Sequence, residues 1–408
     1  MRARWKARTS KGSPLIDSYD RFDMAICRVL TSVMAGPLDG LTIIELAGIG
    51  PAPFAAMMFA DHGARIIRIE RAGRLKLEGD PVERGRIDLS LDLRREEART
   101  ALLALVETAD ALIDPYRPGR IEALGIGPSE LQAVNPKLVI GRLTGYGQTG
   151  PLSQQAGHDI NYLAMAGLLR GMGARGHRPV PPANLVADYG GGAMMLCFGM
   201  LAALLEVRRG AERGRVIDAS IAEGTALVGS MLFGLSRIGE WSSAAESNHL
   251  DGGAPFYRTY RCSDGEYLAV GALEPQFRKQ LLKTLALDHD PLFASDQRDR
   301  WDEQSEVIEE RIGAEPSGHW IQAFGGKDAC VTLVPAMDEI ARHPQHEARG
   351  SFAPLGTGRM PTPVPRYGEK PEPFAKVLKS DTGRDVLREA GLDDRQIDAA
   401  FGSSSPSA

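Results

Sequence analysis

His158 and Asp188 are the side chains whose chemistry and setting stand out in this sequence. His158 lies in the stretch Ala156–Tyr162, and Asp188 lies thirty residues later, one tyrosine ahead of three consecutive glycines. Glycine beside each residue would let a substrate approach the backbone closely. An imidazole can take up and return a proton near neutral pH, and a carboxylate can act as a second base. The pair therefore predicts removal of a proton from one face of a carbon atom and its return to the other.

Each of these residues also has a purely structural interpretation. A lone histidine is often a satisfied core residue, and Asp188 is placed to cap the apolar helix that follows it. A third acid, Glu274, stands before Pro275 and could complete the set, although a glutamate is most often a surface group. Capping and catalysis are compatible at Asp188, so the structural interpretation does not exclude the functional one.

Bulk properties favour a two-domain globular protein. A length of 408 residues exceeds what one hydrophobic core usually serves. The formal net charge of -5 argues against a nucleic-acid binder. The four cysteines are scattered, with no metal-ligand spacing, which predicts reduced thiols and a cytoplasmic location.

Two segments, the N-terminus and one apolar stretch, must be tested as a targeting signal or a membrane span. The basic segment 1–33 lacks the apolar core of a secretory signal, and we expect a disordered extension or a true start at Met34. A transit peptide remains open for it. The stretch Gly190–Val207 is interrupted by glycine and ends at Glu206, so it predicts a buried helix and no membrane span.

Strand and helix patterns alternate through the first half and predict a doubly wound α/β fold with a parallel sheet. The expected strands are 41–46, 64–70, 111–113, 138–143 and 216–220, and the expected helices are 54–62, 96–109, 128–134, 161–169, 191–208 and 221–235.

The second half predicts a smaller α+β domain. A hairpin turns at Ser263–Gly265, helices follow at 275–285 and 302–312, and a short strand follows at 331–335. The proline-rich segment 361–373 is expected to be extended, and 381–401 to be helical. The predicted divisions are an extension at 1–33, a large domain at 34–225, a helical linker at 226–249, a small domain at 250–345 and a returning C-terminal segment with its helix at 346–408.

The loop Gly48–Pro53 follows a strand and precedes a helix, which raises the question of a dinucleotide site. That fingerprint needs a third glycine where Pro53 stands, and two prolines remove amides that would face a pyrophosphate. We therefore interpret the loop as a tight turn, and a dehydrogenase is the weakest functional candidate.

With these residues in view, the chain resembles the racemase branch of the CaiB/BaiF superfamily, the family III CoA-transferases. The similarity runs from about Met34 to about Phe352. The matching stretches are Glu45–Gly48, Leu89–Leu93, Thr144–Pro151, Gly157–Tyr162, Leu250–Tyr257 and Gly271–Phe277.

The resemblance implies a racemase that inverts the α-carbon of 2-methyl-branched acyl-CoA thioesters through an enolate. It implies His158 and Asp188 as the two bases, with Glu274 orienting the histidine. It also implies a role in fatty acid metabolism and an interlocked homodimer. CoA would be part of the substrate, and no metal, flavin or nicotinamide is expected.

The resemblance also implies the residues that contact CoA in the large domain. Arginine forks suit phosphate oxygens, which favours Arg71 and Arg117. The implied contacts are Arg71, Ser90, Leu91, Asp92, Leu93, Asp114, Pro115, Tyr116, Arg117, Gly157, Asp159, Ile160, Asn161 and Tyr162. Arg84, Arg86 and Arg120 are interpreted as solvated surface groups. Ala123 stands where the related pattern often carries arginine, so phosphate affinity is lower unless Arg120 compensates.

Two alternatives stay open. A CoA-transferase of the same superfamily would use the matching carboxylate, Asp188, as a nucleophile that forms a mixed anhydride. A nucleophilic transferase does not need His158 with Glu274, so a racemase is preferred. A non-catalytic acyl-CoA-binding protein is disfavoured because all three ionisable groups are present.

Overall fold

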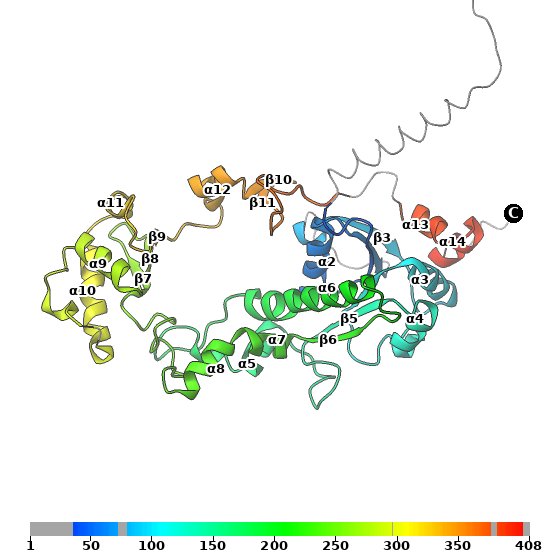
Figure 1. Ribbon diagram of the computed structural model, residues 1–408, viewed down its shortest axis with the longest axis horizontal. Helices are drawn as coiled ribbons and strands as arrows, with labels where there is room; N and C mark the ends of the chain where they lie inside the picture. Colours follow the sequence, from blue (N-terminus) through cyan, green and yellow to red (C-terminus); the bar gives the residue numbers. More distant parts are fainter. Residues whose placement is uncertain (1–35, 72–79, 296, 377–381, 403–408) are drawn as a thin grey trace, which may run out of the picture.

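The computed structural model describes residues 36–71, 80–295, 297–376 and 382–402. The predicted extension at 1–33 lies outside the described residues. The described chain forms two lobes, a larger one on the parallel sheet and a smaller one at the other end of the molecule (Figure 1). The domain boundaries derived from the sequence stay a prediction.

The large lobe is built on a six-stranded sheet, which confirms the predicted mixed α/β architecture. All neighbouring strands pair in parallel, in the order β3-β2-β1-β4-β5-β6. The strands are β1 (Thr42–Leu46), β2 (Arg65–Glu70), β3 (Arg86–Ser90), β4 (Ala111–Asp114), β5 (Val139–Thr144) and β6 (Val216–Ser220). The strand order reverses between β1 and β4, and ligands of such sheets bind beyond the carboxyl ends of the strands at this point. A ligand site is therefore expected at the loops that follow β1 and β4.

Helices cover both faces of the sheet because successive side chains of each strand point to opposite faces. Ile43 packs with the helices α2 (Pro51–Asp61) and α6 (Met194–Arg208). Ile44, one residue on, packs in a second core with α3 (Glu96–Thr108). That second core also contains side chains of α4 (Pro128–Val134), α13 (Gly383–Glu389) and α14 (Asp394–Phe401).

Three predicted helix boundaries were wrong. Helix α2 begins at Pro51 and not at Phe54, because a proline at the first helical position gives up no intrahelical hydrogen bond. The helix expected at 221–235 is two helices, α7 (Ile221–Val228) and α8 (Ser230–Arg237), which divide at Gly229. The last helix divides at Gly391, whose φ of 88° ends α13 before α14 begins.

The small lobe is a three-stranded antiparallel sheet packed on helices. Its strands are β7 (Tyr257–Arg261), β8 (Tyr267–Gly271) and β9 (Val331–Leu333), and its helices are α9 (Pro275–Thr284), α10 (Trp301–Gly313) and α11 (Ser317–Phe324). Tyr260, Leu268, Ile308 and Trp320 lie in its core. The hairpin around Ser263–Gly265 is confirmed by the antiparallel pairing of β7 with β8.

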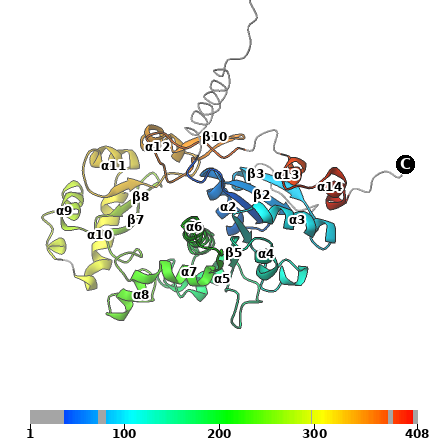
Figure 2. The same cartoon turned by 45° about the vertical axis from the view of Figure 1, so that its right-hand side comes forward.

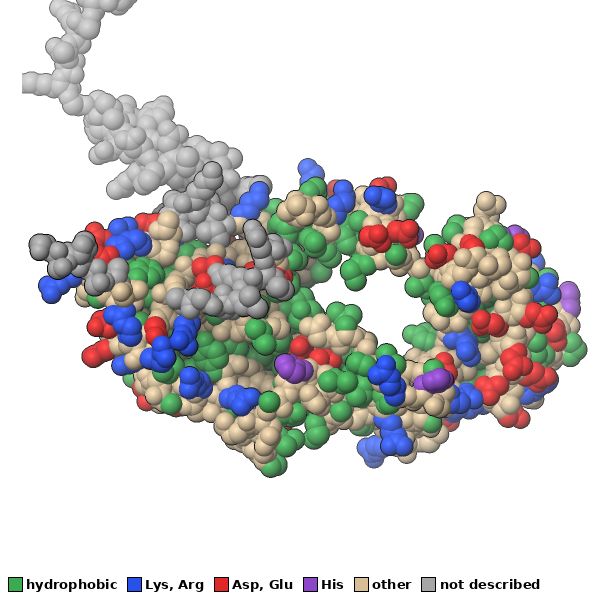
Figure 3. All heavy atoms as spheres, turned by 180° about the vertical axis from the view of Figure 1, so that it is seen from behind, with side chains coloured by type: hydrophobic (Ala, Val, Ile, Leu, Met, Phe, Trp, Pro, Cys, Tyr) green, Lys and Arg blue, Asp and Glu red, His purple; other side chains and the backbone are tan. Residues whose placement is uncertain are grey.

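Two segments join the lobes and enclose an opening. One runs through α5 (Asp159–Met165), α7 and α8, and the other returns through α12 (Pro344–Arg349) and the hairpin β10 (Phe352–Leu355) with β11 (Gly358–Pro361) (Figures 1 and 2). The returning segment is attached to α2, where the Ala375 amide donates to Asp61 Oδ1 at 3.2 Å. Figure 3 shows that side chains do not fill the space between the lobes.

Helix α6 is only partly a buried helix. Its inner face, with Leu196, Met200 and Leu204, lies in the core of the large lobe, whereas Phe198 on the other face is 75% exposed. Within the described residues, one helical stretch, Leu185–Arg208, is long and apolar enough to cross a membrane by length and composition alone, and 44% of its apolar 18-residue window is buried. A core helix with one exposed apolar face meets the same test.

Candidate active site

His158 lies at the start of helix α5 and is exposed. Its backbone amide donates to Asn161 Oδ1 at 3.0 Å, which fixes the turn into the helix. The preceding position, Gly157, requires glycine, because a Cβ there would lie 2.7 Å from Tyr146 Oη and 2.7 Å from the Tyr162 ring. The glycine thus admits two tyrosine rings, and these rings define where the histidine sits.

Asp188 lies inside a nine-residue π-helix, Leu185–Ala193, which continues into α6. The prediction that Asp188 caps this helix is wrong, because the helix already begins at Leu185 and Asn184 occupies the capping position. π-helical turns are rare and are frequent at functional sites. The wider turn carries the Asp188 carboxyl on the wall of a cavity, where it is half-buried.

The structure brings His158 and Asp188 together in one cavity of about 460 Å³. The cavity lies at the point expected from the strand order, since loops after β1 and β4 supply part of its wall. Its lining comprises Ile49–Ala52, Pro115, Arg117, Leu143–Tyr146, Ser153, Gln155–His158, Tyr162, Asp188 and Ile221. Two bases of different chemistry therefore reach one enclosed space from separate elements.

Electrostatics make Asp188 a stronger base than an ordinary aspartate. Desolvation by burial, followed by the neighbouring charge of Asp159, raises the pKa of Asp188 to about 6. His158 and the side chain of Asn184 act in the opposite sense. At pH 7 a group with this pKa is mostly ionised and still accepts a proton readily.

Tyr162 closes the side of the cavity next to the histidine. Its hydroxyl donates to the carbonyl of Gly157. Burial, and then the charge of Asp188, raise its pKa to about 12, so the phenol stays protonated. Tyr162 is therefore a wall of the site, and its hydroxyl proton is engaged by the Gly157 carbonyl.

The glycines near the two bases do not all serve the substrate, contrary to expectation. A Cβ at Gly191 would lie 2.2 Å from Thr225 Oγ1, so this glycine allows α7 to pack closely on the π-helix. Gly50 is the glycine that does face the site. Its φ is 68°, and a Cβ there would lie 3.4 Å from Asp188 Oδ2. The loop after β1 is thus a tight turn, as predicted, and it is also a wall of the cavity.

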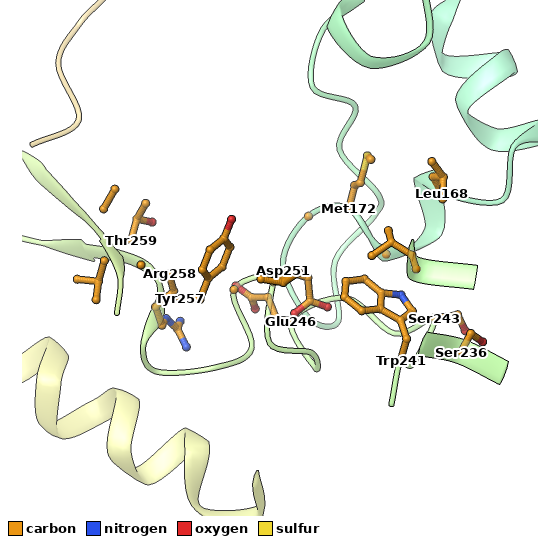
Figure 4. A pocket seen from close by; sticks show the side chains of 18 of the residues that line it. Leu168, Met172, Ser236, Trp241, Ser243, Glu246, Asp251, Tyr257, Arg258 and Thr259 are labelled. Atoms are coloured by element: carbon orange, nitrogen blue, oxygen red, sulfur yellow. The ribbon is translucent and has the colours of Figure 1, made fainter. Parts of the chain in front are cut away.

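Glu274 is not near His158 within the chain. It precedes α9 in the small lobe, is exposed, and does not line the cavity of the two bases. Glu274 lies instead near Cys330, whose pKa is raised by burial and then by the charges of Asp328 and Glu274. Cys330 lines a second cavity of about 1070 Å³ between the lobes. Figure 4 shows this second cavity, with Leu168, Met172, Trp241 and Tyr257 around it.

The residues implied in CoA binding lie at the carboxyl ends of three strands of the sheet, the adjacent pair β3 and β2 and, beyond β1, strand β4. Arg71 follows β2, Ser90 ends β3, and Arg117 follows β4 and lines the cavity. Two of the implied residues, Leu91 and Leu93, have buried side chains in the hydrophobic core, which leaves their backbone for a ligand. Asp92 accepts from Arg94 Nε at 2.8 Å.

Asp114 has both carboxylate oxygens engaged within the chain. Oδ2 accepts from Arg142 Nε at 3.0 Å, and Oδ1 accepts from the Tyr116 amide at 2.9 Å. Burial is the main cause that raises the pKa of Asp114 to about 6. Asp114 therefore supports the loop that carries Tyr116 and Arg117.

Sequence reasoning missed one structural feature close to the site. Arg86 is buried and is ion-paired with Glu45, Nε to Oε2 at 2.6 Å, and it also donates to the carbonyl of Pro53. Arg84 pairs with Asp61. The interpretation of these two arginines as solvated surface groups is wrong, because the start of β3 and the turn before it lie against α2, where Arg86 contacts Pro53 and Arg84 contacts Asp61. An acid in an otherwise apolar strand, Glu45, was the available signal.

Among the described residues, no group of three or more histidine, cysteine, aspartate or glutamate side chains is arranged to hold a metal ion. The expectation that the reaction needs no separate cofactor stays a prediction.

The chain belongs to the CoA-transferase family III, whose model matches residues 38–377. Its relatives include the alpha-methylacyl-CoA racemase of Mus musculus, which is 41% identical over 88% of this chain and 95% of that protein. The alpha-methylacyl-CoA racemase of Homo sapiens is 42% identical over 77% of this chain and 82% of its own length. The crystal structure of a CAIB/BAIF family protein from Brucella suis has the same fold, with a TM-score of 0.72 at 23% identity over 88% of this chain and all of that one.

Proposed function

We propose that this protein inverts the α-carbon of 2-methyl-branched acyl-CoA thioesters by a two-base proton transfer. The observation that carries the proposal is the shared cavity of His158 and Asp188, reached from two different elements. Similarity to racemases over most of the chain supports the same reaction.

The reaction requires one base on each face of the α-carbon. One base removes the α-proton, and the electron pair of the C–H bond moves into the thioester to form an enolate. The conjugate acid on the opposite face then delivers a proton to the α-carbon, and the carbonyl re-forms with inverted configuration. The raised pKa of Asp188 suits this exchange of roles, because a group whose pKa lies near the working pH is available as a base and, once protonated, returns its proton readily.

The enolate oxygen needs a donor, and the start of α5 supplies one next to His158. The first amides of a helix have no intrahelical acceptor. We assign the Asp159 amide to this role, because helix α5 begins at that residue. Arg117 and Arg71 are assigned to the CoA phosphates.

The proposed active unit is an interlocked homodimer in which Glu274 of one protomer orients His158 of the other. Three observations support it: the opening between the lobes, the exposed position of Glu274 and an apolar stripe on α6. The stripe consists of Met194, Phe198, Leu201 and Leu205, which share one helix face and are all exposed. Apolar faces of this kind mark protein contacts.

Mixed dimers test the shared site. A dimer of one His158→Ala chain with one Glu274→Ala chain contains one intact site only if the two residues meet across protomers, so about half of wild-type activity is expected. The matched control carries both substitutions on one chain beside a wild-type chain, which leaves no intact site if the residues meet across protomers and one intact site if they meet within a chain. An active control beside an inactive test mixture would exclude a shared site.

The alternative is a CoA-transferase in which Asp188 attacks the thioester carbonyl and forms a mixed anhydride. The presence of His158 in the same cavity favours the racemase, because the nucleophilic route does not require it. Incubating one enantiomer of a 2-methylacyl-CoA with the protein in heavy water should give the other enantiomer with deuterium at the α-carbon. Transfer of CoA to an added carboxylic acid without α-exchange would establish the transferase instead.

The cellular setting follows from the substrate class. Branched acyl-CoA esters place the reaction in lipid metabolism, and we propose a cytoplasmic location. The described cysteines Cys197, Cys262 and Cys330 are free thiols, which fits a reducing compartment. Cell fractionation with an antibody to the chain would test the location.

A further inference from the structure

Asp159 connects the two bases of the site, although it is not itself placed to exchange a proton with the α-carbon. It follows His158 directly in the chain, and its side chain is buried with 6% exposure. Its Oδ2 accepts from the Asp188 amide at 2.8 Å and from the Ala187 amide at 3.1 Å. These bonds join the start of α5, which carries one base, to the π-helix that carries the other.

We infer that Asp159 is a positioning residue that holds the backbone of Asp188 at a fixed place relative to His158. The inference deepens the proposed function and rests on it. The amides of the π-helix need an acceptor because they lie in its first turn, where intrahelical bonds are missing. A buried carboxylate that accepts hydrogen bonds from two such amides holds the π-helix firmly to α5, since hydrogen bonds to a charged acceptor are about twice as strong as neutral ones.

The same carboxylate also sets the charge around Asp188. The groups that face Asp188 are His158, Asp159 and Tyr162 from α5, with Tyr146 and Arg117 on the same cavity. Of these, Asp159 is the neighbouring negative charge that opposes ionisation of Asp188. Removing the charge of Asp159 lowers the pKa of Asp188. Removing the acceptor oxygen of Asp159 breaks the hydrogen bond that holds the Asp188 amide. Different substitutions of Asp159 therefore test the two effects separately.

Asp159→Asn keeps an oxygen for the two amides and removes the charge, whereas Asp159→Ala removes both. In Asp159→Ala we expect racemisation kcat to fall about 10²-fold with KM within about threefold, because small misplacements of a reacting group cost rate and not binding. Exchange of the α-proton should survive only for the enantiomer that presents it to His158. Asp159→Asn should keep kcat within about fivefold and shift the acid limb of its pH profile to lower pH.

The matched control is Asp264 in the small lobe, which also accepts backbone amides, those of Ser317 at 2.9 Å and Glu266 at 3.3 Å. Asp264→Ala should leave the exchange pattern and the pH profile unchanged. Wild-type behaviour of Asp159→Ala, or equal damage in Asp159→Asn, would overturn the inference.

A second readout is independent of turnover. The carboxyl carbon of Asp188, assigned in ¹³C spectra by its loss in Asp188→Asn, should titrate at lower pH in Asp159→Asn than in the wild type, and an unchanged midpoint would contradict the inference. Absence of α-exchange in the wild type would refute the racemase proposal alone and leave this titration to decide on Asp159.

Discussion

Carboxyl groups in the parallel strands and on the wall of the adjoining cavity are of two kinds. One kind is ion-paired with an arginine, and the other, in the described part of the chain, is not. Glu45 and Asp114 stand in neighbouring strands, are fully buried, and each pairs with an arginine. Asp188 lies on the cavity wall, and the described residues form no ion pair with it. The first kind holds the strands and loops together, whereas the second carries its carboxyl group on the wall of an accessible cavity.

A raised pKa by itself does not separate these two kinds of group. Burial raises the pKa of Asp114 and of Asp188 to about 6 in both cases. The difference is geometric: both oxygens of Asp114 accept hydrogen bonds within the chain, whereas Asp188 faces the cavity beside His158. Access to the cavity shared with His158, more than basicity, makes Asp188 and not Asp114 the candidate base.

The largest expected effect is on the cavity pair. Substituting His158→Ala or Asp188→Ala should lower racemisation by about 10³-fold to 10⁴-fold, since each removes one acid–base partner of the α-carbon. The change in optical rotation of an enantiopure 2-methylacyl-CoA measures it. Retention of more than a tenth of the wild-type rate in either variant would contradict the assignment of that residue.

The paired arginine should instead govern stability. Arg86→Met removes the arginine that is ion-paired with the buried Glu45, and we expect the free energy of unfolding to fall by about 3–5 kcal/mol in denaturant titrations. The double variant Glu45→Leu with Arg86→Met is the control, because replacing both charges by apolar groups should recover most of that loss. A single variant as stable as wild type would show that the pair does not support the fold.

Glu274 should show an intermediate effect on activity and little on stability, because it is exposed within the chain. Glu274→Gln is expected to lower kcat by about 10²-fold through a misoriented histidine, with KM nearly unchanged. Steady-state kinetics measure this split. An unchanged kcat would remove Glu274 from the proposed site.

The smallest expected effect concerns how the ionisation of Asp188 changes the folding stability of the protein with pH. The folded-state pKa of Asp188 is about 6, above the ordinary 3.8, so the folded protein binds this proton more tightly than the unfolded chain does. Stability from this group is complete below about pH 4 and is lost as the pH rises through about 6. Asp188→Asn should therefore exceed the wild type at pH 7.5 by about 1 kcal/mol after solvent screening, and the gain should vanish at pH 4. Thermal melts at the two pH values decide this.

Much of the large lobe could be predicted from the sequence because its strands are short apolar runs between helical patterns. Strands β1, β2, β4, β5 and β6 were expected near their observed places, whereas β3 was not proposed as a strand. Its sequence, Arg86–Ser90, carries an arginine and an aspartate, and only tertiary pairing buries Arg86. Local pattern cannot reveal a charge whose partner lies 41 residues away.

The site was predictable in its residue types and less so in its local structure. His158 and Asp188 were both identified from the sequence, and the structure brings them into one cavity. The π-helix was missed because Asp188 has the chemistry of a cap, although the helix begins three residues earlier. In the proposed homodimer Glu274 meets His158 only across protomers, and no pattern within one chain encodes how two chains assemble.

The most direct measurement is a crystal structure of the protein with a bound 2-methylacyl-CoA. The account predicts a dimer in which His158 and Asp188 approach the α-carbon from opposite faces at about 3–3.5 Å, with Glu274 of the second protomer beside the imidazole. A substrate whose α-carbon is reached by only one of the two side chains, or by both from the same face, would contradict it.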